Sequence, residues 1–212
     1  MADYADKIIH GYETETPYLI EAYGQLCPED VLAPVAEFLP DTGKVLDVGA
    51  GIGTNAVWLA SRGCEVAAVE PAKTFRNHGK NGYPSRNVSW HNGRLPMLSG
   101  IGFSKGDFDT VLAIGVLHHL VPTDQAAAIE TFASLLKPSG RMILSLRHGP
   151  CPASRPGFSV SADLITEVAV QCGFDVRHRS ENGSIQPANR RAGVTWTWLV
   201  LDAPEFDLKA GC

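Results

Sequence analysis

A glycine-rich turn constrains this fold more than any other feature of the sequence. Residues 45–60 read VLDVGAGIGTNAVWLA, an apolar run that ends near an acid, then three glycines at alternate positions, then a segment with helical spacing. Glycine reaches backbone conformations that other residues avoid, and it leaves the main chain bare. The segment therefore predicts a strand that turns into a helix at a place where a ligand lies against the backbone.

Two acids accompany this turn. Asp47 precedes the first glycine by two residues, and Glu70 ends the next apolar run. The glycines are spaced G-x-G-x-G, whereas the dinucleotide fingerprint needs its third glycine one place later, where this chain has Thr54. Asp47 would also repel a pyrophosphate at the start of the helix. A dehydrogenase is therefore the more distant alternative.

The same acids suit a ligand with an ammonium at one end and a ribose nearby. A carboxylate at the position of Asp47 attracts a cationic group, and one at the position of Glu70 accepts two hydrogen bonds from a ribose diol. An amino-acid-bearing nucleoside has both groups. S-adenosylmethionine is such a nucleoside, and we expect it as the cofactor.

Beyond the turn, short apolar runs alternate with amphipathic ones. We predict strands near 44–48, 65–69, 87–91, 109–115 and 141–147, and helices near 54–62, 72–80, 123–136 and 161–172. A turn is expected at 137–140, and segments 174–179 and 194–201 predict a closing antiparallel hairpin. The expected fold class is α/β, a doubly wound, seven-stranded, mostly parallel sheet with helices on both faces.

Residues 1–40 are expected to form a helical cap. Thr16 followed by Pro17 is typical of a helix start. Pro34 must kink or begin a second helix. We expect one domain over residues 1–212, with the cap covering a core at residues 44–201.

Composition excludes several classes of function. A net charge of −5 disfavours a broad phosphate-binding surface, and with it DNA as a partner. No run of about 18 apolar residues predicts a membrane span, and no N-terminal export signal is visible, so we expect a cytoplasmic protein. No metal site or disulfide framework is expected, because the cysteines are odd in number and contain no C-x-x-C pair. They are Cys27, Cys64, Cys151, Cys172 and Cys212.

With these motifs in order, the sequence resembles the class I S-adenosylmethionine-dependent methyltransferases of the small-molecule type, which have a Rossmann-like fold. The resemblance runs from about Lys44 to Leu201. It is carried by VLDVGAGIG, the acid of VAAVEP, WHNGRLP, FDTVLAIGVLHHL and LKPSGRMILSL. It implies S-adenosyl-L-methionine as the cofactor and S-adenosyl-L-homocysteine as the product.

The resemblance also implies a set of cofactor-binding residues. They are Asp47, Gly49, Ala50, Gly51, Gly53, Glu70, Pro71, Asn92, Gly93, Ile114 and Gly115. The glycines would line the methionine part, Glu70 would hold the ribose, and Asp47 would orient the amino-acid end. Asn92 stands where family members often have an aspartate for the adenine amino group, and its carbonyl oxygen accepts the same hydrogen bond. For Pro71 and Ile114, ordinary packing is an equal alternative.

Candidates for catalysis and acceptor binding follow the fourth and fifth strands, where open α/β sheets bind ligands. His119 and His148 are candidate bases for an acceptor that must lose a proton. Alternatively, His119 fixes the following loop. Tyr12, Tyr18, His119, Arg147 and His148 are the candidate substrate-binding residues. Arg147 could grip a carboxylate or phosphate, or pair with a helix acid. Tyr12 is expected in a nonperiodic stretch before the first helix, as part of a lid.

These expectations favour in-line transfer of a methyl group to a small-molecule acceptor. Two alternatives remain open, a methyltransferase that acts on protein or RNA and a noncatalytic S-adenosylmethionine-binding protein. DNA amino-methylases carry an N/D-P-P-Y/F motif after the fourth strand, where this chain has Gly115-Val116-Leu117-His118. We predict neither the methylated atom nor the oligomeric state.

Overall fold

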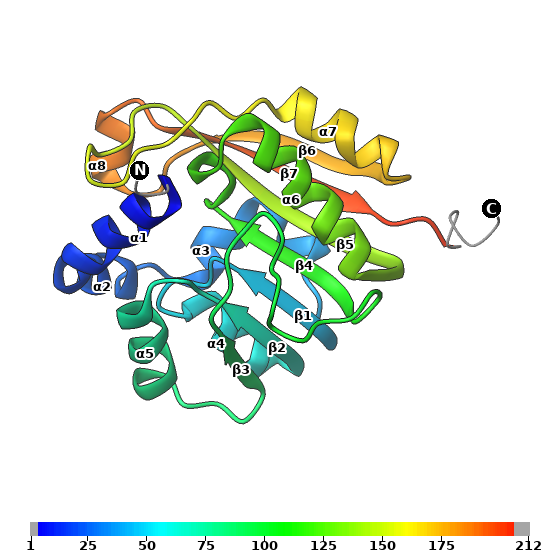
Figure 1. The fold of residues 1–212 in the computed structure, drawn as a ribbon, viewed down its shortest axis with the longest axis horizontal. Helices are drawn as coiled ribbons and strands as arrows, with labels where there is room; N and C mark the ends of the chain where they lie inside the picture. Colours follow the sequence, from blue (N-terminus) through cyan, green and yellow to red (C-terminus); the bar gives the residue numbers. More distant parts are fainter. Residues whose placement is uncertain (1–3, 206–212) are drawn as a thin grey trace.

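The computed structural model describes residues 4–205, which form a seven-stranded sheet with helices on both faces (Figure 1). Residues 1–3 and 206–212, among them Cys212, lie outside the described residues. The spatial order of the strands is β3-β2-β1-β4-β5-β7-β6. Their bounds are Gly43–Val48 (β1), Cys64–Val69 (β2), Val88–His91 (β3), Phe108–Ile114 (β4), Leu136–His148 (β5), Asp175–Gly183 (β6) and Thr195–Asp202 (β7).

The strand directions confirm the predicted doubly wound sheet. Strands β1 to β5 run parallel, and β7 is antiparallel to both of its neighbours. The chain leaves β1 toward β2 and β3 and then returns to place β4 on the other side of β1. This switch point sets the carboxyl ends of β1 and β4 side by side, which is where open α/β sheets bind ligands.

Helices pack on both faces of the sheet because successive side chains of a strand point to opposite faces. Val45 and Leu46 are both fully buried, but they belong to different apolar clusters. The cluster around Leu46 includes α6 and α7, whereas the cluster around Val45 includes α3 and α4. The helices are Tyr4–Thr14 (α1), Thr16–Gly24 (α2), Pro28–Leu32 (α3), Ala33–Phe38 (η1), Thr54–Arg62 (α4), Lys73–Gly82 (α5), Leu117–His119 (η2), Pro122–Leu135 (α6), Ala162–Gln171 (α7) and Pro187–Arg191 (α8).

None of the helices within residues 4–205 combines the length and apolar character needed to cross a bilayer. The apolar residues of α6, which has 14 residues, pack into the core instead. Ile129 and Phe132 of this helix are fully buried against the sheet.

The structure differs from the local expectations at three places. Tyr12 lies inside α1 instead of before a helix, and its ring packs edge-on against Phe75 with 5.6 Å between centroids. The segment expected as a turn at 137–140 lies within the bounds of β5 but takes no part in its pairing with β4, which passes from Phe108–Leu136 to Thr110–Arg141. The short α8 was not predicted, since five residues carry no helical period.

The cap formed by α1 and α2 lies at the end of the sheet between α5 and α8 (Figure 1). Polar contacts tie it to the core on two sides. Glu13 accepts a hydrogen bond from the Thr74 backbone amide of α5 at 3.1 Å. Glu15 forms an ion pair with Arg155 at 3.0 Å. The cap therefore bridges two separate parts of the core.

Candidate functional site

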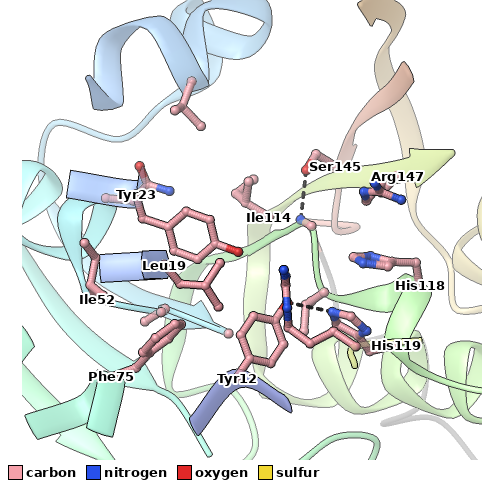
Figure 2. Close-up of a pocket in the computed structure, with 18 of the residues that line it drawn as sticks. Tyr12, Leu19, Tyr23, Ile52, Phe75, Ile114, His118, His119, Ser145 and Arg147 are labelled. Atoms are coloured by element: carbon pink, nitrogen blue, oxygen red, sulfur yellow. Dashed lines mark hydrogen bonds between the residues drawn. The ribbon is translucent and has the colours of Figure 1, made fainter. Parts of the chain in front are cut away.

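A cavity of about 860 Å³ lies beneath the cap, at the carboxyl ends of the central strands (Figure 2). Its walls come from the glycine turn, the ends of β2, β4 and β5, both cap helices and the β6–β7 connection. We call the part lined by the glycine turn and residues 69–72 the cofactor side. The part lined by α1, η2 and residues 147–158 is the acceptor side.

The glycine turn exposes main chain to the cavity. Gly49, Gly51 and Gly53 all have positive φ, at 71°, 58° and 88°. A Cβ on Gly51 would meet nothing within 4 Å, so the turn faces open space there. A Cβ on Gly53 would lie 2.6 Å from the Trp90 ring, and Gly53 does not line the cavity. Gly53 therefore allows close packing at the start of α4, while Gly49, Ala50 and Gly51 form the wall.

Glu70 fixes the turn from the neighbouring strand. Its Oε2 accepts a hydrogen bond from the Gly51 amide at 2.9 Å, and its Oε1 accepts one from the Ala72 amide at 2.8 Å. Burial raises the pKa of the Glu70 carboxyl to about 7, although both hydrogen bonds oppose this shift. Each carboxylate oxygen keeps one further lone pair for a ligand hydroxyl.

Asp47 is a buried acid without a complete set of partners. It lines the cavity, only 2% of its surface is exposed, and its Oδ2 has no hydrogen-bond partner among the described residues. Burial raises the pKa of the Asp47 carboxyl to about 7. A buried carboxylate without a partner is unfavourable, and an ammonium group in the cavity would supply that partner. Asp47 thus fits the cationic end of the expected cofactor.

We expect the affinity for S-adenosylhomocysteine to depend on pH because of these two acids. Below pH 7, both carboxyls of the ligand-free protein take up protons, and an ammonium must displace the proton on Asp47. Affinity should therefore rise up to about pH 7. It should then level off, because the amino group of S-adenosylhomocysteine lies beside its own carboxylate and stays protonated over this range. Calorimetric titrations from pH 5.5 to 8.5 measure this profile, and a flat profile would contradict it.

Pro71, Gly93 and Leu95 line the cavity beyond Glu70, but Asn92 does not. The Asn92 Oδ1 lies 3.5 Å from Arg76 Nη1, which also donates to the Glu70 carbonyl at 2.6 Å. The structure therefore places Asn92 beside Arg76. Of the predicted pair Asn92 and Gly93, Gly93 alone lines the cavity.

Ile114 and Gly115 line the cavity at the end of β4. Gly115 has a φ of 64°, and its amide donates to the Ser145 Oγ at 2.9 Å (Figure 2). Ser145 is fully buried and also lines the cavity. Sequence reasoning missed Ser145, because nothing in the apolar run of β5 sets it apart from a packed strand residue.

Tyr12 and His119 face each other on the acceptor side (Figure 2). The Tyr12 hydroxyl lies 2.8 Å from His119 Nε2, and His119 Nδ1 lies 3.1 Å from the Pro156 carbonyl. A carbonyl only accepts, so Nδ1 carries the proton and Nε2 accepts the hydrogen bond from Tyr12. Burial lowers the pKa of His119 to about 4 and raises the pKa of Tyr12 well above its usual range. At neutral pH both groups are uncharged.

Of the other predicted substrate-binding residues, two line the cavity and one does not. Arg147 lines the cavity, and so does Tyr18, although 67% of Tyr18 is exposed. His148 does not line the cavity; its Nε2 lies 2.8 Å from the Thr197 Oγ1. The wall also includes Glu15, Tyr23, His118, Arg155 and Trp196, with residues 182–186 and 188–189 from the end of β6 and the connection to β7.

The fold and the glycine turn are those of the Rossmann-like α/β proteins. Residues 19–203 match the family model of the methyltransferase domain. The chain therefore belongs to this methyltransferase family, and the resemblance to the class I S-adenosylmethionine-dependent methyltransferases is confirmed.

Individual relatives share parts of the chain. An uncharacterized methyltransferase of Staphylococcus carnosus is 27% identical over 139 residues, which are 66% of this chain and 60% of the relative. A ubiquinone biosynthesis O-methyltransferase of Xanthomonas axonopodis is 33% identical over 136 residues, or 59% of this chain and 54% of the relative. The matched part of this chain thus spans less than two thirds of these relatives.

A solved structure shows the same fold. The 1,6-didemethyltoxoflavin-N1-methyltransferase of Burkholderia thailandensis, crystallised with its substrate and S-adenosylhomocysteine, superposes with a TM-score of 0.72 at 18% identity. The superposition covers 95% of this chain and 89% of that protein. At this identity the likeness concerns the fold.

Proposed function

We propose that the protein transfers the methyl group of S-adenosylmethionine to a small-molecule acceptor. The observation that carries this proposal is the pair of buried acids, Asp47 and Glu70, which line one cavity on either side of a bare glycine turn. An ammonium and a ribose diol satisfy these two acids together. The family match over residues 19–203 supports the same assignment.

In this proposal, each part of the cofactor side has its own task. Asp47 pairs with the ammonium, Glu70 accepts the ribose hydroxyls, and the turn at Gly49 and Gly51 lets the methionine part approach the main chain. Gly93 and Pro71 flank the base. When bound, S-adenosylmethionine supplies an electrophilic methyl group, and transfer needs mainly an aligned nucleophile.

On the acceptor side, His119 is the group placed to accept a proton, and an acceptor that admits water or an anion to this pocket would raise its pKa from about 4. Its Nε2 is unprotonated, because Nδ1 donates to the Pro156 carbonyl. The Tyr12 hydroxyl occupies Nε2 in this structure, so an acceptor hydroxyl would either replace Tyr12 or reach His119 through it. The same contacts allow the alternative that His119 positions the cap.

A small acceptor is favoured by the enclosure of the cavity. The cap helices contribute Ile8, Tyr12, Leu19 and Tyr23 to its walls, and a segment of folded protein or RNA would have to displace them. The names of two relatives, a ubiquinone biosynthesis O-methyltransferase and a didemethyltoxoflavin N1-methyltransferase, describe small-molecule acceptors and support the same choice.

Methyl-labelled S-adenosylmethionine tests the proposal directly. The protein is incubated with a cell extract divided by size into small molecules, RNA and protein. We expect protein-dependent label in the small-molecule fraction. Label confined to RNA or protein would contradict the small acceptor, and saturable cofactor binding without any transfer would contradict the activity. A lack of cofactor binding by folded protein would reject the whole assignment.

A further inference from the structure

Arg147 is the next-to-last residue of β5, on the acceptor side, and neutral groups hold its guanidinium. Its Nη1 donates to the Gly149 carbonyl at 3.2 Å and to the Cys151 Sγ at 3.1 Å, and its Nη2 donates to the Pro150 carbonyl at 2.7 Å. These contacts use three of the five N–H donors of a guanidinium. Among residues 4–205, the Nε donor and one Nη2 donor form no hydrogen bond, and a guanidinium can present its Nε–H and one Nη2–H side by side along one edge.

The charge of Arg147 is not matched by an acid. Among residues 4–205, no ion pair joins Arg147 to a carboxylate, whereas the neighbouring Arg155 is paired with Glu15 at 3.0 Å. Burial lowers the pKa of His118 well below its usual range, and the charges of Arg147 and Arg155 add to this shift. Of the two arginines on this part of the wall, Arg155 is therefore balanced by Glu15, whereas Arg147 has no paired carboxylate among the described residues.

His118 is a second polar group here that lacks a partner. Only 6% of its surface is exposed, and its Nδ1 has no hydrogen-bond partner among the described residues. Figure 2 shows Arg147, His118 and His119 one after another along the same side of the cavity. A buried imidazole nitrogen without a partner is unfavourable, and a polar ligand group would satisfy it.

We propose that the acceptor carries a carboxylate, bound by the open edge of Arg147 with His118 beside it. This inference rests on the proposed function. The two parallel donors of the open edge match the two oxygens of a planar carboxylate. One unmatched positive charge suits a single negative charge better than the double charge of a phosphate. The remaining wall contains Tyr12, Tyr23 and Trp196, which suit a flat apolar body attached to that carboxylate.

Benzoate and benzamide are the matched probes, since they share shape and differ in charge. Each is titrated calorimetrically into the complex of the full chain with S-adenosylhomocysteine. We expect saturable binding of benzoate and binding of benzamide at least ~10-fold weaker. Arg147→Gln should abolish this preference, and Arg147→Lys should retain part of it. Affinity for S-adenosylhomocysteine should change less than about twofold in both variants, because Arg147 lies on the acceptor side.

The control is Arg177→Gln, at an exposed arginine of β6 that does not line the cavity. It should leave the preference for benzoate intact. Equal binding of both probes, no benzoate binding, or a preference that survives Arg147→Gln would overturn the proposal. Displacement of benzoate by equimolar inorganic phosphate would assign the site to phosphate instead. If the unaltered protein does not bind S-adenosylhomocysteine, the proposed function itself is rejected. This result is distinct from failure of the carboxylate site, in which S-adenosylhomocysteine still binds.

Discussion

Asp47→Asn should weaken the binding of S-adenosylhomocysteine by roughly 100-fold, because removing one partner of a buried ion pair costs about 3 kcal/mol. The same change should make the ligand-free protein more stable at pH 8, by on the order of 1 kcal/mol. Asp47 has no partner at Oδ2 in the ligand-free protein, so its charge opposes folding until a cation binds. If Asp47 had only a structural role, Asp47→Asn would lower both the stability of the ligand-free protein and its affinity for S-adenosylhomocysteine.

The pH dependence gives the sign of the stability effect. Burial raises the pKa of the Asp47 carboxyl to about 7, above its value in the unfolded chain. Between about pH 4 and 7 the folded state therefore binds more protons, and the stability contributed by Asp47 falls as pH rises. The gain from Asp47→Asn should accordingly be larger at pH 8 than at pH 5. Urea unfolding at the two pH values measures it.

Asp163→Asn is the matched control for this variant. Asp163 lies on α7, 82% of its side chain is exposed, and it forms an ion pair with the exposed Arg179. It should leave the affinity for S-adenosylhomocysteine unchanged. If Asp47→Asn also leaves that affinity unchanged, or destabilises the ligand-free protein at pH 8, Asp47 does not hold the cofactor ammonium.

Gly11→Ala should separate the cap from the acceptor side. A Cβ on Gly11 would lie 2.0 Å from the Ser154 carbonyl oxygen, so either α1 or the backbone of the loop must move. We expect a loss of about 1–3 kcal/mol in the free energy of unfolding. With α1 displaced, Tyr12 no longer covers His119, and water reaches the imidazole. The pKa of His119 should then rise from about 4 toward its usual value near 6.5.

An NMR titration of the histidine ring protons measures this change, and His119→Gln identifies the signal. Gly24→Ala is the control, because a Cβ there would meet only the Tyr83 hydroxyl, at 3.9 Å. It should leave the pKa of His119 low and the protein stable. If Gly11→Ala leaves the His119 titration unchanged, the contact between Tyr12 and His119 does not depend on the docking of α1.

Most of the fold could be predicted because its elements carry their own patterns. The buried strand β4 is apolar from Val111 to Ile114, and Gly63, with a φ of 117°, ends α4 as expected. The packing of Tyr12 could not be predicted, since its ring contacts Phe75, which lies far away in the sequence. The residues of α8 likewise form a helix too short to show a period.

The cofactor side was predictable for a similar reason. Asp47 and Glu70 stand at strand ends next to a recognisable glycine turn, and parallel strands bring such ends together. In the rest of the cavity wall, Tyr23, Ser145 and Arg155 come from three unrelated segments that meet only in the folded chain. No spacing in the sequence links them, so tertiary structure alone reveals their proximity.

The two-sided attachment of the cap has a kinetic consequence. Glu13 ties α1 to α5 beside the cofactor side, and Glu15 at the start of α2 ties the cap to Arg155 beside the acceptor. If the cap moves as one body, the cofactor side and the acceptor side open together, because the movement breaks both the Glu13 and the Glu15 contacts. Entry of the nucleoside and release of the methylated compound would then depend on the same movement of the cap.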